Sequence, residues 1–81
     1  QNYPNPFNPL TTIAYSLPQA NHVILTLYTI TGQKAAVVMD AHQEAGDHTV
    51  VFDGSGYANG VYLYCLEAGS FVETKPMVLL K

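Results

Sequence analysis

The sequence predicts one all-β domain, an antiparallel immunoglobulin/fibronectin-III-like β-sandwich of roughly six to seven strands. Short stretches of alternating apolar and polar residues, rich in β-branched and aromatic side chains, recur about every 8–12 residues. Glycine, proline and asparagine gather between these stretches, where turns are expected. A chain of 81 residues has room for a single hydrophobic core, so residues 1–81 are expected to form one domain.

The first nine residues are expected to differ from the strands that follow them. Pro4, Pro6 and Pro9 each fix φ at about −65° and lack an N–H donor, so this segment can be neither a helix nor a central strand. We expect an extended strap, in which Asn5 bonds to nearby backbone and the ring of Phe7 anchors to the core. The strap is predicted to close one end of the sandwich and is the candidate for the seventh strand.

The next part of the chain predicts four strands, at residues 11–17, 23–30, 34–39 and 48–52. The turn at 31–33 contains Gly32, which can adopt a positive φ and join two strands as a hairpin. A polar stretch, residues 40–47, is predicted to be a connection, tightest at its Ala-Gly pair. The alternating side chains predicted to face the core are Ile13, Tyr15, Leu17, Val23, Leu25, Leu27, Val50 and Phe52.

The last two strands are predicted at residues 61–68 and 71–80, after a glycine-rich loop at 53–60. Asp53 is expected to accept hydrogen bonds from N–H groups of this loop, and several of its glycines are expected to adopt unusual backbone conformations. The strand that begins at 61 is apolar on both faces, so it is predicted to be central. Pro76 requires an edge position or a bulge for the last strand.

The composition excludes several classes of partner. Charged residues make up only 11% of the chain, with a net charge of −3 and no arginine, so neither nucleic acid nor an anionic membrane surface is expected as a partner. No apolar stretch approaches the ~18 residues of a membrane span, so no membrane insertion is expected, and no signal peptide is recognisable. Because the chain begins at Gln1, we expect it to be a segment of a longer secreted protein.

No catalytic site, cofactor or metal ion is expected. His22 and His42 are placed in loops and His48 at a strand start, and their spacings of 20 and 6 residues match no metal-binding signature. Cys65 is the only cysteine, so an internal disulfide is excluded, and it is expected to be buried in a strand without a glycine elbow to make it a nucleophile. Ser55 lies between glycines but lacks the strand–turn–helix context of a hydrolase.

Two ligand sites remain open from the residues alone. Asp53 and Asn59 flank the glycine-rich loop and, with asparagines of the strap, form a candidate for a weak calcium site, although one carboxylate supplies little charge. A carbohydrate site would need an exposed aromatic row on one sheet face. The tyrosines in alternating positions are more simply core residues or cross-strand pairs: Tyr15, Tyr28, Tyr62 and Tyr64.

The opening motif Asn-Tyr-Pro-Asn-Pro-Phe-Asn-Pro, followed by Thr-x-Ile-x-Tyr-x-Leu, resembles the start of the type A C-terminal sorting domain of the type IX secretion system. The resemblance extends over essentially all 81 residues. Further motifs match in the same order: Gly32-Gln33, Ala45-Gly46-x-His48, Asp53-Gly54, Gly60-Val61-Tyr62, Gly69, and Thr74-Lys75-x-Met77 before Lys81.

The resemblance implies a non-catalytic, monomeric sorting signal that directs its parent protein to the cell surface or the medium. The implied partners are the outer-membrane machinery of type IX secretion, which recognises the folded domain, and a cell-surface sortase-like peptidase, which often removes it. The residues that the matching motifs mark for recognition or fold are Pro4, Asn5, Pro6, Phe7, Gly32, Asp53, Gly60, Val61, Tyr62, Lys75, Met77 and Lys81.

Two departures from the family pattern fall in the last two predicted strands. Cys65 stands where similar domains usually have arginine, and Pro76 stands where lysine is common. Either change can weaken recognition without unfolding the domain. Two other functions are alternatives: a structural or adhesive module, similar to the immunoglobulin-like modules of the flagellar hook-capping scaffold, and a carbohydrate-binding module of a secreted enzyme.

Overall fold

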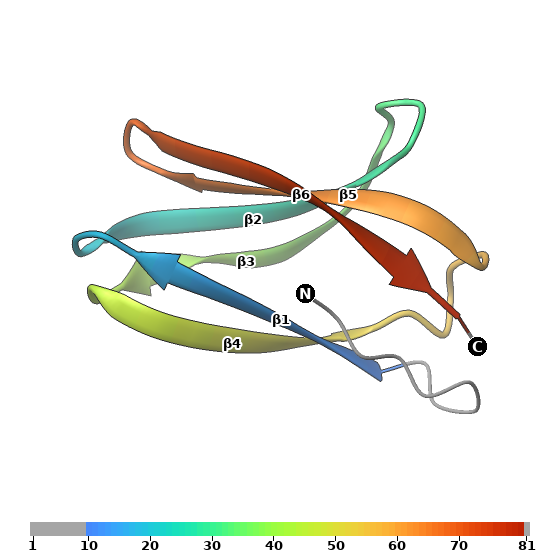
Figure 1. The fold of residues 1–81 in the computed structure, drawn as a ribbon, viewed down its shortest axis with the longest axis horizontal. Coiled ribbons are helices and arrows are strands. Elements are labelled where there is room, and N and C mark those ends of the chain that lie inside the picture. The colour runs from blue at the N-terminus through green and yellow to red at the C-terminus, as the bar shows by residue number, and fades with distance from the viewer. Residues whose placement is uncertain (1–9, 81) are drawn as a thin grey trace.

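Six β-strands and no helix make up residues 10–80, the part of the chain that the computed structural model describes (Figure 1). The strands are β1 (Leu10–Leu17), β2 (Asn21–Thr29), β3 (Lys34–Gln43), β4 (Gly46–Asp53), β5 (Gly60–Ala68) and β6 (Phe71–Leu79). The all-β class and all six strands predicted from the sequence are confirmed. The strap, and with it the possible seventh strand, lies outside the described residues.

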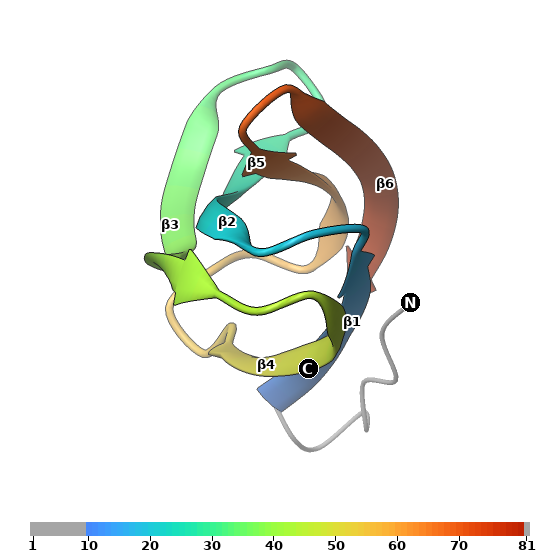
Figure 2. The same ribbon diagram turned by 90° about the vertical axis from the view of Figure 1, so that its left-hand side faces the viewer.

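The strands form two antiparallel sheets that face each other (Figure 2). The smaller sheet pairs β1 with β4, and the larger has the order β3-β2-β5-β6. This arrangement is consistent with the immunoglobulin-like sandwich that the sequence predicted. As expected, β5 is central, between β2 and β6, and Pro76 lies in an edge strand, where its missing N–H donor breaks no ladder to a further strand.

The core lies between the sheets and is built from alternate residues of facing strands. In β1 every second side chain is buried, and the inward side chains of β2 and β5 include Leu25, Leu27 and Leu66, which have no exposed surface. Burying each such leucine contributes about 1.5–3 kcal/mol. All the predicted core residues are buried except Val50, which is half-buried and packs against the core.

The predicted connection at residues 40–47 is wrong. β3 continues to Gln43 and β4 begins at Gly46, so only residues 44 and 45 join them. The polar residues belong to an edge strand with mostly exposed or half-buried positions, and shifts in register between β2 and β3 break the simple alternation. The predicted tight point is present, because Gly46 has a φ of 118° as the chain passes from one sheet to the other.

Gly32 and Gly60 adopt positive φ values in two of the connections between strands. Gly32 has a φ of 93° and closes the β2–β3 hairpin, with its N–H donating to the carbonyl of Thr29 at 2.9 Å, as predicted. In the loop before β5, only Gly60 has a positive φ, at 151°. The expectation of several unusual conformations is therefore wrong for Gly54 and Gly56.

Gly60→Val is expected to destabilise the domain by about 1–3 kcal/mol, because a β-branched residue strongly disfavours a φ of 151°. Thermal unfolding followed by circular dichroism should show a Tm lower by roughly 4–8 °C for each kcal/mol. Gly56→Ala is the matched control, since Gly56 has no positive φ and a Cβ there would meet no atom within 4 Å. Equal Tm values for the two variants would contradict this account of Gly60.

Candidate functional site

The structure does not bring the predicted recognition residues together into one site. Gly32, Asp53 and Gly60 shape turns and the loop before β5. Tyr62 and Met77 belong to the core, where they are 8% and 1% exposed, and the Tyr62 hydroxyl donates to the carbonyl of residue 58 at 2.7 Å. Tyr62 and Met77 are therefore largely out of reach of a partner that contacts the surface, whereas Gly32, Asp53 and Gly60 are exposed.

Val61 and Lys75 are exposed on strands, and they lie on opposite faces of the larger sheet. Val61 lies directly opposite Val78 on the outer face, and both are partly exposed. Lys75 lies opposite Tyr64 on the inner face, where its ammonium forms an ion pair with Glu73 at 3.5 Å. The remaining predicted residues lie outside the described part of the chain: Pro4, Asn5, Pro6, Phe7 and Lys81.

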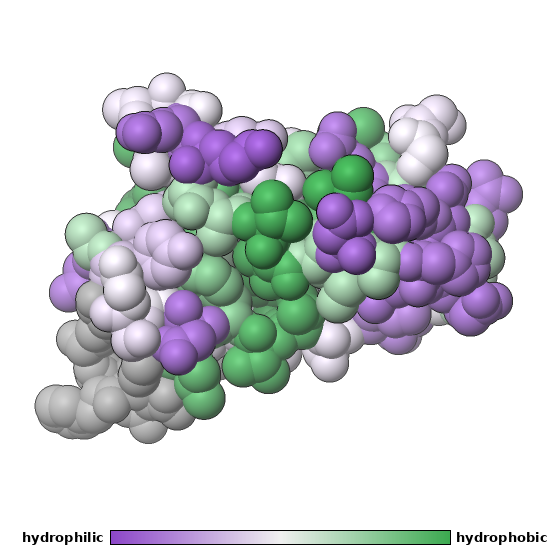
Figure 3. Space-filling view, turned by 180° about the vertical axis from the view of Figure 1, so that it is seen from behind, coloured by the Kyte–Doolittle hydropathy of each residue, from purple (hydrophilic) through white to green (hydrophobic). Residues whose placement is uncertain are grey.

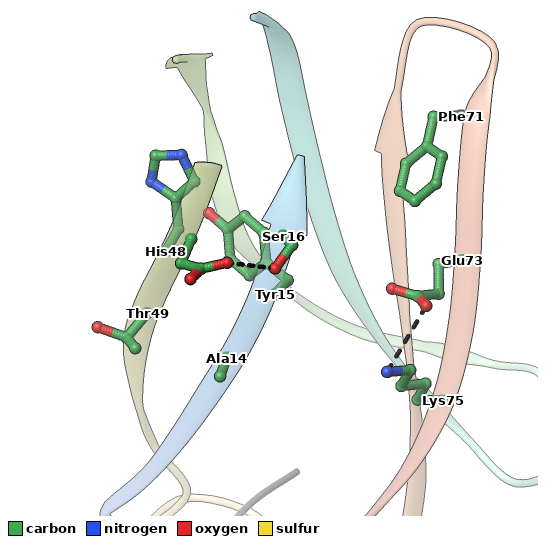
Figure 4. A pocket seen from close by; sticks show the side chains of 9 residues that line it. Ala14, Tyr15, Ser16, His48, Thr49, Phe71, Glu73 and Lys75 are labelled. Carbon is green, nitrogen blue, oxygen red and sulfur yellow. Dashed lines mark hydrogen bonds and ion pairs between the residues drawn. The ribbon is translucent and has the colours of Figure 1, made fainter. Parts of the chain in front are cut away.

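A cleft of about 600 Å³ opens between the smaller sheet and the first half of β6. Figure 4 shows its walls: Ala14 and Ser16 extend from β1 on one side, and Phe71, Glu73 and Lys75 extend from β6 on the other. The cleft exists because two strands cover the inner face of four. Among the described residues, no strand covers the inner face of the first half of β6, where the smaller sheet ends.

The exposure of the inward side chains changes along β6. Residues 71, 73 and 75 are half-buried or exposed, whereas Met77 and Leu79 are buried. The sequence analysis missed the cleft, although the inward series Phe-Glu-Lys-Met-Leu gives a signal, because two charged residues interrupt an apolar face. The sequence does not show which strand lies across the cleft from these residues.

Several side chains of the cleft contact other side chains. The Ser16 hydroxyl donates to Asp47 at 2.5 Å, and the ring of Tyr15 stacks on His48 with centroids 5.5 Å apart. The Tyr15 hydroxyl donates to Gln43 of the larger sheet. Burial raises the pKa of Tyr15, and the bond to Gln43 partly opposes this.

The histidine positions correct a prediction. His22 lies in β2 and His42 in β3, not in loops, and the two are directly opposite in the ladder. His22 contacts Asp40 at 2.5 Å, and His42 contacts Glu44 at 3.1 Å. Within residues 10–80 no three or more His, Cys, Asp or Glu side chains are placed to hold a metal ion.

Cys65 is half-buried on the outer face of β5, so the prediction of a buried cysteine is wrong. Within residues 10–80 no second layer of strands covers this face, although β5 is central in its sheet. Pro76 lies on the same face, opposite Leu63 in the next strand. Cys65 and Pro76 therefore lie on one surface, the outer face of β5 and β6.

The sequence left two ligand sites open, one for carbohydrate and one for calcium. An exposed tyrosine row is absent among the described residues, because Tyr15, Tyr62 and Tyr64 are buried in the core. For calcium, the carboxylate of Asp53 accepts the Ser55 N–H at 3.0 Å, which confirms the predicted turn. The asparagines that would complete a calcium site lie in the strap, outside the described residues.

The surface opposite the view of Figure 1 is apolar across its middle. Figure 3 shows hydrophobic side chains there, with strongly hydrophilic residues on both sides of them, most densely towards one end. Within residues 10–80, no helix is long and apolar enough to span a membrane.

Comparison with known proteins identifies one family. The model of the family described as "Secretion system C-terminal sorting domain" matches residues 1–80. No match was found among curated proteins or among solved structures.

Asp53→Asn is expected to change how stability depends on pH. The N–H and hydroxyl of Ser55 donate to Asp53 and hold the pKa of its carboxyl below 3.8. Because the folded-state pKa is lowered, this stabilisation is present above about pH 4 and is lost as the pH falls through the folded-state value. Thermal unfolding between about pH 2 and pH 7 should show a steeper acid loss of Tm for the wild type than for D53N, whose amide oxygen still accepts the Ser55 bond. Parallel pH profiles would contradict this role.

Proposed function

The chain belongs to the family of secretion system C-terminal sorting domains, and we propose that the secretion machinery recognises it as a folded domain, through the outer face of its last two strands. Domains of this family are sorting signals for type IX secretion, which confirms the resemblance seen in the sequence. The chain directs the protein that carries it across the outer membrane of a Gram-negative bacterium, to the cell surface or the medium. In doing so it interacts with the secretion machinery.

No reaction is assigned to the domain, because sorting domains of this family are in general not catalysts. Neither alternative function gains support. The aromatic row that a carbohydrate-binding module would need is mostly buried.

The outer face of β5 and β6 supports the proposed contact. Val61 and Val78 are 44% and 43% exposed and stand opposite each other. Leu63 and Pro76 form the next pair along the same face, and neither is charged. Contiguous exposed apolar side chains of this kind are typical of protein–protein contacts.

Cys65 and Pro76 add uncharged residues to this face. The resemblance seen in the sequence implies an arginine and a lysine at these two positions in similar domains. We expect the contact in this protein to depend on apolar burial more than on charge. Arginine or lysine would contribute mainly to orientation and rate of association at such a surface.

A fusion tests the sorting role directly. A signal peptide, a fluorescent protein and residues 1–81, in that order, should place fluorescence at the surface or in the medium of a type IX-secreting bacterium. A strain that lacks the outer-membrane translocon should retain the fusion in the periplasm. Retention in both strains, with the domain shown to be folded, would overturn the role.

The same fusion tests a second proposed partner. A cell-surface sortase-like peptidase is proposed to remove the domain after export. The exported fluorescent protein should then be lighter by the mass of the domain in the parent strain and keep its full mass in a strain without that peptidase. Equal masses in the two strains would contradict removal of the domain by this peptidase.

Val61→Ser with Val78→Ser tests the outer face. We expect export of the fusion to fall roughly fivefold to thirtyfold, the loss equivalent to ~1–2 kcal/mol of apolar contact. Surface substitutions usually change stability by no more than about 0.5 kcal/mol, so the Tm should stay near the wild-type value. Val51→Ser is the matched control, because Val51 is 60% exposed on β4 of the other sheet. Equal export of the double variant and the control would argue against this face.

A truncation is a poorer test of the same idea. Removing residues 78–81 would also remove Leu79, which is completely buried and pairs with Gly60. Loss of export would then report unfolding as readily as loss of recognition.

A further inference from the structure

Gly54 is required by what lies beside it and not by its backbone conformation. Its φ is not positive, so the left-handed region that favours glycine does not explain the residue. Gly54 is buried, and a Cβ added to it would lie 2.4 Å from Cδ1 and 2.9 Å from Cδ2 of Leu79. Carbon atoms that are not bonded to each other pack at about 3.5–4.0 Å, so a side chain at position 54 would displace Leu79.

Leu79 contacts both ends of the loop that joins β4 to β5, which lies beside the end of β6 (Figure 1). Its side chain packs against Gly54, the first residue of the loop, and it pairs with Gly60, the first residue of β5. Leu79 is the last residue of β6 and has no exposed surface. The end of the last strand is therefore held by this loop.

Hydrogen bonds hold the loop itself in place. The N–H of Ser55 donates to the carboxylate of Asp53 at 3.0 Å. The N–H of Tyr57 donates to the carbonyl of Gly54, also at 3.0 Å. At the other end of the loop, the hydroxyl of Tyr62 donates to the carbonyl of residue 58 at 2.7 Å. A larger residue at position 54 would therefore move the end of β6 more easily than it would move the loop.

The position of Leu79 determines the position of its neighbour Val78. Successive side chains of a strand point to opposite faces, so Leu79 is buried in the core while Val78 is 43% exposed on the outer face. Val78 lies opposite Val61 there. A shift of the backbone at Leu79 would therefore change the outer face at this pair.

We propose that Gly54 is a positioning residue for recognition, because the room it leaves for Leu79 fixes Val78 beside Val61 on the outer face. The inference rests on the proposed function, in which the secretion machinery contacts that face. Gly54 does not contact the machinery in this scheme and acts only through Leu79. Asp53 and Gly54 then have separate tasks: Asp53 closes the turn, and Gly54 leaves space for the last strand.

Gly54→Ala tests the proposal in the chain of residues 1–81. The NMR resonances of Val78 should shift, and amides at the end of β6 that bond to β5 should exchange about tenfold faster, because the buried site becomes overpacked. In the fluorescent fusion, export should fall about fivefold or more at a temperature below the Tm of the variant. Gly56→Ala is the matched control in the same loop, since Gly56 has no positive φ and a Cβ there would meet no atom within 4 Å. It should change neither exchange nor export.

Leu79→Val is the compensating change. Valine lacks the two Cδ atoms that the added methyl group would meet, so Gly54→Ala with Leu79→Val nearly conserves the volume of the site. The double variant should restore slow exchange at the end of β6 and recover at least about half of the lost export. Should Gly54→Ala alone fail to fold, the double variant is expected to fold.

A Gly54→Ala variant that exchanges and exports like Gly56→Ala would overturn the proposal. A double variant that is no better than Gly54→Ala would overturn it as well, and so would normal export despite faster exchange. The exchange measurements need no secretion machinery, so they test the packing of Leu79 on Gly54 independently of the proposed function. Failure of the outer face itself would appear as normal export of the Val61→Ser, Val78→Ser double variant.

Discussion

The fold depends on one constraint: two strands must bury the inner face of a sheet of four. The alternate side chains of β1 meet those of β2 and β5 in a core whose centre, including Ile13, Leu25 and Leu66, is fully shielded from water. Because side chains alternate with a period of two, a slip of one residue in any of these strands would expose its whole apolar set. The hydrogen bond from Tyr15 to Gln43 further ties the smaller sheet to the larger.

The incomplete cover explains both candidate surfaces. Where the smaller sheet ends, charged side chains of β6 face the cleft. On the other face of the larger sheet, which no strand of residues 10–80 covers, β5 and β6 expose valines and half-bury Cys65. A domain this small buries only about 60–65% of the surface of its unfolded chain, so exposed apolar area is expected. The position of this area, on the last two strands and beside β1, follows from the strand order alone.

Much of the fold followed from the sequence because its strongest signals are local. The strict alternation in β1, the glycine turn at Gly32 and the proline in the last strand each act within a few residues. β3 and β4 were less visible: their polar ends resemble a loop, since an exposed edge strand does not need an apolar pattern. The exposed sites were hardest to predict. Lys75 faces a cleft and Cys65 faces solvent only because of which strands pair, and pairing joins residues far apart in the chain.

The same pairing limits how a sorting signal of this kind can be read. Met77 and Leu79 are core residues, and Leu79 pairs with Gly60, whose φ of 151° fixes the entry to β5. The last strand therefore cannot leave the sheet as an extended peptide without exposing these two side chains, a cost of about 1.5–3 kcal/mol for each. That cost is a large share of the stability of a small domain. Outward-facing residues of the same strand, such as Val78, are accessible without it. Recognition of the folded surface is thus the less costly mode, and it couples export to correct folding.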